Sequence, residues 1–265
     1  MRDFKEKVAI VTGGARDIGR ECSLKLAENG ASVCINYFDK KEQAEETKKM
    51  IEDGGGKAII VQGDMTKQDD VDKLVAECKK SFGDKIDVLV NVAGGALHTP
   101  HIFSEIDEVA WDKVVDINLK GTFLCCQVLV DQFRKQGQGG KIVNISALAG
   151  RWLGSLAGCH YTAAKAGVIG LTRHLAHELG PEGIFVNSIA PTITLASERT
   201  VNLWNSRPNE YKEKVISQIP LRRLSTPEEV AAGVIFLCTD EASYMTGVTL
   251  DSNGGRFFSQ QMTKS

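Results

Sequence analysis

Apolar runs of strand length alternate along the chain with longer segments in which apolar residues recur at helical spacing. The runs are rich in Val and Ile on both faces, which is typical of strands covered by helices on both sides. The seven runs occupy residues 7–12, 32–37, 57–62, 86–91, 141–146, 184–190 and 247–251. The helical segments include residues 40–54, 67–82, 105–136 and 161–180. This alternation predicts an α/β fold built on a doubly wound parallel sheet.

Residues that start and stop helices support these boundaries. Thr226-Pro227-Glu228-Glu229 has the pattern of a helix N-cap followed by proline at the first helical position. Glycines follow the first two helical segments, at Gly30 and Gly54–Gly56. The chain shows no long linker, repeat or low-complexity segment, so we expect a single domain over residues 1–265. Residues 192–226 are its least regular part.

Composition and charge narrow the class of protein. Lys and Arg number 32 against 34 Asp and Glu, a balance that indicates neither a nucleic-acid nor a membrane partner. No apolar stretch approaches the roughly 18–20 residues that span a bilayer, and we find no signal-peptide core. The seven cysteines are an odd number and lack C-x-x-C spacing, which favours reduced thiols over disulfides or a metal site. We therefore expect a cytoplasmic enzyme or binding protein that holds no metal.

The loop Thr12–Gly19 follows the first apolar run and opens a helical segment. In a doubly wound sheet, ligands bind beyond the carboxyl ends of the strands, which is where this loop lies. Gly13 and Gly19 allow a tight turn and close packing of helix on strand, and the N–H groups of the first helical turn, around Ile18, face a pyrophosphate. The loop therefore predicts a dinucleotide site.

Two charged residues of this loop bear on the cofactor. Asp17 stands where such loops often carry glycine, and we interpret it as a first-turn residue favoured by the helix dipole and paired with Arg20. NAD-selective sites commonly place an acidic residue at the end of the second strand, but Tyr37 stands there in this chain. We take Tyr37 as a cofactor-binding residue. Arg16, with no carboxylate at that strand end, favours NADP(H) over NAD(H). The alternative is that Arg16 is simply solvated.

The strongest motif is CHYTAAKAGVIG, which contains Tyr161 and Lys165. At positions i and i+4 of a helix, the two side chains share one face. A nearby ammonium group favours tyrosinate and lowers the phenol pKa from its usual value of about 10. Tyr161 can therefore act as a general acid–base for a carbonyl and alcohol pair. Together with the dinucleotide loop, the motif predicts an oxidoreductase.

With these residues the chain resembles the short-chain dehydrogenase/reductase family, from about Lys7 to Gly255. The segments that carry the resemblance are TGGARDIG, LVNVAGG, DINLKG, VNISALAG, CHYTAAK, VNSIAP and PLRRLSTPEEVAAGVIFLCTDEASYMTG. The last segment is close to the 3-oxoacyl-carrier-protein-reductase-like branch. The resemblance implies a Rossmann-type fold and an NAD(P)-dependent oxidoreductase that transfers hydride between nicotinamide and a ketone or secondary alcohol.

The resemblance also implies a role for individual residues. Tyr161 would exchange the proton, Lys165 would hydrogen-bond the nicotinamide ribose and lower the pKa of Tyr161, and Asn118 would hold a water of the proton relay. Other residues would bind the cofactor: Asp64 and Met65 beside the adenine, Asn91, Ala93 and Gly94 beside the adenosine ribose, and Pro191, Ile193 and Thr194 beside the carboxamide and phosphate. A homotetramer is expected because, in the family, the helices that carry Asn118 and Tyr161 pack across subunits.

The chain also departs from the family pattern, at Asp17, Val92, Ala147 and Thr192. Ala147 matters most, because the family has a serine there that polarises the substrate oxygen. The usual separation between this serine and the tyrosine is 13 residues, whereas Ala147 precedes Tyr161 by 14 residues and Ser146 by 15. Counted from Ala147, the segment carries one extra residue. Ser146 supplies the hydroxyl after a small shift, or Ser155 or His160 reaches in, or the hydrogen bond is missing. We take Ser146 as the candidate.

Three alternative functions remain open. The departures motivate a cofactor-sensing member of the family that does no chemistry. An NAD-dependent alcohol, polyol or steroid dehydrogenase is a second alternative. A methyltransferase on a similar sheet is a third, although it would have no need of Tyr161 and Lys165. The resemblance also implies that residues 95–104, 147–160 and 192–220 wall the substrate pocket and that 192–226 is a substrate-loop segment. These residues do not identify the substrate.

Overall fold

The computed structural model describes residues 4–152 and 157–256. Seven strands form one sheet in the order β3-β2-β1-β4-β5-β6-β7, and every neighbouring pair is parallel. The strands are β1 (Val8–Thr12), β2 (Ser32–Tyr37), β3 (Lys57–Gln62), β4 (Val88–Asn91), β5 (Gly140–Ile145), β6 (Ile184–Pro191) and β7 (Thr249–Ser252). Their limits lie within two residues of the predicted runs. The predicted doubly wound α/β fold is confirmed.

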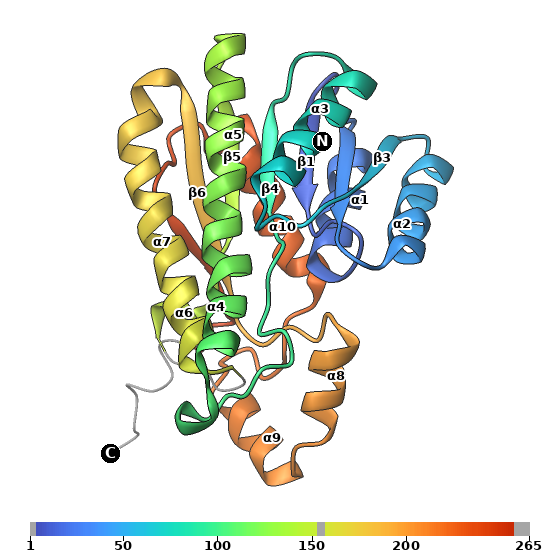
Figure 1. Cartoon of the computed structure of the whole chain (residues 1–265). Helices are drawn as coiled ribbons and strands as arrows, with labels where there is room; N and C mark the ends of the chain where they lie inside the picture. Colours follow the sequence, from blue (N-terminus) through green and yellow to red (C-terminus); the bar gives the residue numbers. More distant parts are fainter. Residues whose placement is uncertain (1–3, 153–156, 257–265) are drawn as a thin grey trace.

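Helices cover both faces of the sheet (Figure 1). The helices are α1 (Asp17–Glu28), α2 (Lys41–Asp53), α3 (Gln68–Phe82), α4 (Glu108–Val115), α5 (Gly121–Gln136), α6 (Leu148–Arg151), α7 (Cys159–Leu179), α8 (Glu198–Asn205), α9 (Asn209–Ser217) and α10 (Pro227–Cys238). One core cluster joins the sheet to α1, α2 and α10, and a second joins it to α3, α5 and α7. Because both faces are covered, β1 and β4 are buried along their whole length, as their Val-rich and Ile-rich sequences predict.

The predicted helical segment 105–136 is divided in two. A π-helical turn, Asp116–Lys120, separates α4 from α5 and contains the fully buried Asn118. Single π-helical turns within a helix occur frequently at functional sites. Such a turn redirects a side chain without ending the helix. The turn marks the region around Asn118 as part of the candidate site.

Residues 192–226 are more regular than predicted, since they contain α8 and α9. Figure 1 shows these two helices beyond one end of the sheet. The predicted N-cap at Thr226 is confirmed: its side chain and that of Glu229 form a capping box, and Pro227 occupies the first position of α10. The segment therefore forms a helical projection beside the carboxyl ends of the strands.

All seven cysteines are free, and six of them are buried. The neighbouring pair Cys125 and Cys126 packs in the core between α5 and the sheet. Among the described residues, none of the helices has the length and apolar character that crossing a membrane requires. In the same part of the chain, no cluster of three or more His, Cys, Asp or Glu residues could hold a metal ion.

Candidate active site

The loop between β1 and α1 is shaped by two polar residues at strand ends. Asn36, on β2, accepts the N–H of Gly13 with its side-chain oxygen at 3.1 Å and the N–H of Gly14 with its carbonyl at 3.0 Å. The hydroxyl of Thr12 accepts two backbone N–H groups from the loop after β4, at 3.1 and 3.2 Å. Neither role was predicted, although a polar residue within the apolar run SVCINY is a signal that points to Asn36. The hydrogen bonds of Asn36 and Thr12 hold the carboxyl ends of β1, β2 and β4 together at one edge of the sheet.

The first turn of α1 leaves backbone N–H groups available to an anion. The first bond within the helix joins the N–H of Arg20 to the carbonyl of Arg16 at 2.9 Å. The N–H groups of Asp17, Ile18 and Gly19 come before it and have no carbonyl partner in the helix. Among the described side chains, none caps this end. Free N–H groups at the positive end of a helix are what a pyrophosphate requires.

Glycines bring the backbone segments of this edge close together. Gly13 has a φ of +61°, and a Cβ on it would lie 3.0 Å from the backbone of Ala93. A Cβ on Gly19 would lie 2.0 Å from the carbonyl oxygen of Gly13. Side chains at these positions would fill the loop, so the predicted requirement for glycine at positions 13 and 19 agrees with the geometry.

Asp17 is the first residue of α1, as predicted, but its backbone is left-handed, with a φ of 56°. The predicted pairing with Arg20 is wrong, because Arg20 instead binds Thr47 and Glu46 on α2. The carboxylate of Asp17 lies 3.7 Å from Arg16 Nε. Burial raises the pKa of Asp17, and the charges of Arg16 and Arg20 oppose this rise. The left-handed backbone of Asp17 is a conformation that glycine adopts without strain.

Three residues predicted to bind the adenosine half lie at the ends of β2 and β3. The ring of Tyr37 packs in the core. Met65 is buried against α5, with its Sδ 3.7 Å from Cys125 Sγ. Asp64 Oδ1 accepts two hydrogen bonds from Thr66, at 3.0 and 2.8 Å. All three stand at the predicted edge of the sheet, and their contacts with a cofactor stay predictions.

Asn91, at the end of β4, turns its side chain into the core. Its Nδ2 donates to Asn144 Oδ1 at 2.9 Å, and Asn144 Nδ2 donates to Thr172 Oγ1 on α7 at 3.0 Å. This buried chain of hydrogen bonds ties β4, β5 and α7 together beneath the crevice. Since the side chain of Asn91 is engaged in the core, the predicted contact with the adenosine ribose would be made by the backbone around Ala93 and Gly94. This contact stays a prediction.

Asn118 and Lys165 meet beside the loop that follows β4. The Asn118 carboxamide accepts the N–H of Gly95 at 3.0 Å and donates to the carbonyl of Gly95 at 2.8 Å. A Cβ on Gly94 would lie 2.5 Å from Asn118 Oδ1 and 3.5 Å from Lys165 Nζ. The side chain of Asn118 thus holds this loop against the π-helical turn. A water held by Asn118 stays a prediction.

Tyr161 and Lys165 share one face of α7, as predicted. Lys165 Nζ lies 5.7 Å from the centroid of the Tyr161 ring and donates to the carbonyl of Ile145 at 2.7 Å. Lys165 is almost fully buried, and this burial lowers its pKa to about 8. An ammonium group in this position favours the tyrosinate form of its neighbour. The geometry suits proton transfer by Tyr161 at the carboxyl end of β5.

The serine hydroxyl expected near Tyr161 is engaged elsewhere. Ser146 is buried, and its Oγ donates to the carbonyl of Ile189 on β6 at 2.8 Å. Ala147 is buried beside it and precedes α6. His160 is fully buried, and both of its ring nitrogens have partners, whereas Ser155 lies outside the described residues. Ser146 would have to rotate away from Ile189 to reach a substrate, and its catalytic role stays a prediction.

The segment after β6 carries a buried hydroxyl that needs a partner. The N–H of Thr192 donates to the carbonyl of Ser252 at 3.1 Å, but Thr192 Oγ1 has no partner among the described residues. Thr194 Oγ1 lies 2.7 Å from Ser225 Oγ. A carboxamide offers both a donor and an acceptor to such a hydroxyl. This hydroxyl, the glycine loop and the uncapped helix all fit a nicotinamide dinucleotide.

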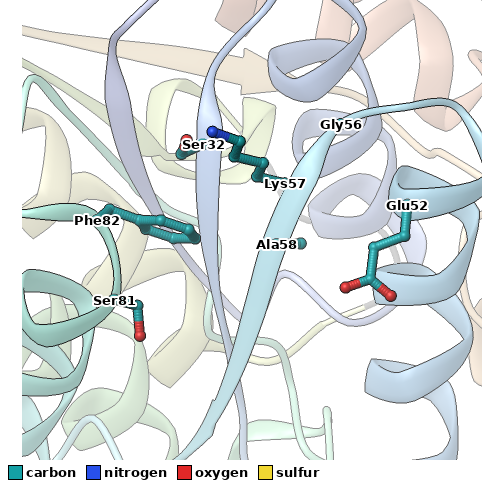
Figure 2. Close-up of a pocket in the computed structure, with 7 residues that line it drawn as sticks. All are labelled: Ser32, Glu52, Gly56, Lys57, Ala58, Ser81 and Phe82. Atoms are coloured by element: carbon teal, nitrogen blue, oxygen red, sulfur yellow. The ribbon is translucent and has the colours of Figure 1, made fainter.

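A separate hollow lies at the opposite edge of the sheet. Figure 2 shows its lining, which comes from the amino ends of β2 and β3 and from α2 and α3. The residues that line it are Ser32, Glu52, Gly56, Lys57, Ala58, Ser81 and Phe82. Ligands of doubly wound sheets bind at the carboxyl ends of the strands. The hollow is therefore not the dinucleotide crevice, and no residue predicted for the site lines it.

The sheet and the residues at its carboxyl edge define a class, the nicotinamide-dependent oxidoreductases with a doubly wound fold. Comparisons with known proteins narrow it further. Residues 13–256 match the family model described as Enoyl-(Acyl carrier protein) reductase. The crystal structure of a protein from Sinorhizobium meliloti, provisionally assigned as a short-chain alcohol dehydrogenase, is similar with a TM-score of 0.88 and 31% identity. That similarity covers 96% of this chain and 98% of the other.

Curated relatives agree over the full length. The 3-oxoacyl-[acyl-carrier-protein] reductase of Staphylococcus epidermidis is 38% identical over 251 residues, which are 95% of this chain and 99% of that protein. The enzyme of the same name from Synechocystis is 40% identical over 256 residues, which are 96% of this chain and 98% of that protein. The chain therefore belongs to the short-chain dehydrogenase/reductase family, and it is an NAD(P)-dependent oxidoreductase.

Proposed function

We propose that the protein reduces a ketone to a secondary alcohol with NADPH and that Tyr161 is the general acid. The observation that carries the proposal is the buried Lys165 ammonium beside the Tyr161 ring, at the carboxyl edge where the glycine loop lies. The relatives named 3-oxoacyl-[acyl-carrier-protein] reductases make 3-oxoacyl thioesters the first substrates to test.

The bound cofactor would supply the hydride that adds to the carbonyl carbon. Tyr161 would donate its phenolic proton to the carbonyl oxygen, and the Lys165 ammonium would stabilise the tyrosinate that remains. The Asn118 carboxamide holds the loop after β4, which would form one wall of the substrate pocket. Hydride and proton together convert the ketone to the alcohol, so no further reactant is required.

NADPH is favoured over NADH by the charges near the end of β2. The Arg16 side chain is about half exposed, and Lys40 and Lys41 are exposed at the start of α2. Lys40, the N-cap of α2, makes no side-chain cap. A 2′-phosphate would meet these cations and the free helix end. Arg16→Ala should weaken NADPH binding about tenfold, the effect of losing one charge-assisted hydrogen bond, and leave NADH binding nearly unchanged.

The decisive experiment follows NADPH oxidation with 3-oxoacyl thioesters and a panel of ketones. Tyr161→Phe should lower kcat by at least about 10² while the Kd for NADPH stays close to the wild-type value. Tyr244→Phe, at a fully exposed tyrosine, is the matched control. Retained turnover in Tyr161→Phe would refute the mechanism. NADPH binding without turnover of any carbonyl would instead favour the cofactor-sensing alternative, which Ala147 motivates.

We further infer a homotetramer in the cytoplasm. Large apolar side chains remain exposed on α4 and α5 of the monomer, namely Val109, Trp111 and Phe123. Seven free cysteines are consistent with a reducing compartment. Sedimentation of the purified protein tests the assembly state.

A further inference from the structure

Thr99 and His160 connect the loop after β4 to the first turn of α7. Thr99 Oγ1 and His160 Nε2 lie 2.8 Å apart, although the two residues are 61 positions apart in the chain. His160 is fully buried and immediately precedes Tyr161. The contact therefore joins a predicted wall of the substrate pocket to the helix that carries the proposed proton donor.

The second contact of His160 sets the position of its proton. His160 Nδ1 lies 2.9 Å from the backbone N–H of Tyr161 and accepts it. An accepting nitrogen carries no proton, so the neutral ring carries its proton on Nε2. Nε2–H then donates to Thr99 Oγ1, and the Thr99 hydroxyl donates to the carbonyl of Ala96 at 2.6 Å. The three hydrogen bonds therefore form a chain in which each group donates to the next, from the Tyr161 amide to the carbonyl of Ala96.

The turn that receives this chain of bonds is strained. The N–H of Thr99 also donates to the carbonyl of Ala96 at 3.0 Å, which closes a four-residue turn. Its central residues, Leu97 and His98, have φ values of 50° and 57°. Two left-handed residues in succession define a type I′ turn, which favours Asn and Gly. A turn with Leu and His in these positions persists only where other contacts hold it.

The surroundings of His160 are shaped around its ring. A Cβ on Gly158 would lie 2.7 Å from His160 Cε1 and 2.8 Å from Ile106 Cδ1, so the N-cap of α7 has no room for a side chain. On the other side of this contact, Gly95 immediately precedes the turn Ala96–Thr99. The Asn118 carboxamide holds Gly95 through two hydrogen bonds. The loop after β4 is thus fastened at two points to the helical segments that carry Asn118 and Tyr161.

We propose that His160 is a positioning residue that, through Thr99, holds the turn Ala96–Thr99 in place against the helix that carries Tyr161. The contact sets where the substrate carbonyl lies relative to the Tyr161 hydroxyl. Since both ring nitrogens are bonded within the protein, His160 does not itself replace the missing serine. The inference rests on the proposed reductase function, and it predicts an effect on the carbonyl substrate but none on cofactor binding.

Kinetics of matched variants test the positioning role. Thr99→Val keeps the shape of the side chain and removes the hydroxyl, and His160→Asn keeps an acceptor for the Tyr161 amide but does not reach Thr99. Each should lower kcat/KM for the carbonyl substrate at least about tenfold, because small displacements of a reacting group are costly.

The controls separate positioning from a loss of the cofactor site. The Kd for NADPH should stay within about twofold, and Thr99→Ser should retain most of the activity. The double variant should be no slower than the slower single variant, since both remove one interaction. Wild-type kcat/KM in Thr99→Val, or effects that add fully, would overturn the proposal.

Glycine at position 98 provides a rescue. Gly adopts a positive φ without strain, so the turn should keep its shape without the Thr99 hydroxyl. In the Thr99→Val background, His98→Gly should therefore recover most of the lost kcat/KM. The absence of recovery would show that the hydroxyl acts in some way other than holding the turn, which would contradict the proposal.

Two measurements do not depend on activity. Nitrogen-15 NMR of the imidazole should show an unprotonated Nδ1 and a protonated Nε2 at His160. Hydrogen exchange at the amides of the turn should be faster in Thr99→Val than in wild type or Thr99→Ser. If exchange is unchanged in Thr99→Val, the positioning role is refuted even if the protein reduces ketones. If exchange changes as expected but no carbonyl is turned over, the proposed function fails and the contact between Thr99 and His160 stands.

Discussion

At the scale of single residues, Asp17 places a carboxylate where the cofactor would bring phosphates. It stands at the N-terminus of α1 with a left-handed backbone, and burial raises its pKa. Asp17→Asn removes the charge and keeps a side chain that tolerates this conformation. We expect NADPH to bind about fivefold more tightly, since two unit charges about 4 Å apart in water interact by about 1 kcal/mol. Titration of NADPH by fluorescence gives the Kd.

Asp17→Gly separates charge from strain at the same position. It removes the carboxylate and also the cost of a left-handed non-glycine residue. If the charge is what weakens binding, the Asn and Gly variants should tighten NADPH binding equally. Tightening in the Gly variant alone would assign the effect to the backbone, and no tightening in either would contradict the expected position of the phosphates.

Ala147 leaves the site without the hydroxyl that the family resemblance predicts. Ser146 cannot serve in its observed conformation, because its Oγ is bonded to Ile189. Ala147→Ser should therefore raise kcat about tenfold by adding a donor for the developing oxyanion, a modest part of the 10²–10³ that a well-placed donor supplies. Ala147→Cys has a similar volume and a much weaker donor, so it should give little or no increase. Equal kcat in the Ser variant and wild type would show that this hydrogen bond is not needed.

Lys165 should impose a pH limit on the reaction. Its pKa is lowered to about 8 by burial, so the ammonium form is present below this pH and is lost above it. Because the ammonium would stabilise the Tyr161 tyrosinate in the proposed mechanism, kcat/KM for ketone reduction should fall as the pH rises through about 8. Lys165→Arg stays charged throughout, and its kcat/KM, although lower, should not show this fall. If kcat/KM falls over the same pH range in wild type and in Lys165→Arg, the titrating group is not Lys165.

At the scale of elements, the N-terminus of α10 is stabilised by an exposed capping box. Thr226 and Glu229 cap the helix, and Arg223 binds both oxygens of Glu229. Thr226→Ala should lower the free energy of unfolding by about 1 kcal/mol. Glu229→Gln should cost less than about 1 kcal/mol, because ion pairs at exposed positions are weakened by solvent. Urea titrations at pH 7 measure both.

The cap also gives a pH dependence with a defined sign. Hydrogen bonds from Arg223 and the Thr226 backbone lower the pKa of Glu229 to about 2, below its usual value of 4.5. A lowered pKa contributes stability above pH 4.5, and this contribution disappears as the pH falls from 4.5 towards 2. The difference in stability between wild type and Glu229→Gln should therefore shrink between pH 5 and pH 3. Glu45→Gln, at an exposed position on α2, is the control.

The sequence predicted the elements well because their signals are local. Apolar runs rich in Val and Ile mark strands covered on both sides, and Tyr161 and Lys165 share a face through simple helical periodicity. The left-handed backbone of Asp17 was missed because a residue's name does not specify its φ. The contact between Thr99 and His160 was missed because it joins residues far apart in the chain, through a turn whose residues do not suit its type. Long-range hydrogen bonds of this kind depend on the assembled fold.

At the scale of the whole molecule, α4 and α5 carry apolar side chains that the monomer leaves exposed. Val109 is 74% exposed, Trp111 40% and Phe123 43%. Exposed apolar groups of this size on neighbouring elements are typical of surfaces that bind a partner. The π-helical turn with Asn118 lies between the same two helices, so contacts made there would also steady one wall of the site.

Phe123→Glu tests whether these helices pack against a second copy. A buried charge without a partner is strongly unfavourable in an interface, so the variant should sediment as a species smaller than the tetramer that we propose for the wild type. Met50→Glu, a matched change at an exposed apolar residue on α2, should leave the assembly intact. If Asn118 depends on the neighbouring subunit, Phe123→Glu should also lower kcat/KM, and the loss should diminish as the protein concentration rises and the subunits reassociate. If Phe123→Glu still sediments as a tetramer, the interface lies elsewhere. If the wild-type protein itself sediments as a monomer, the proposed assembly is refuted.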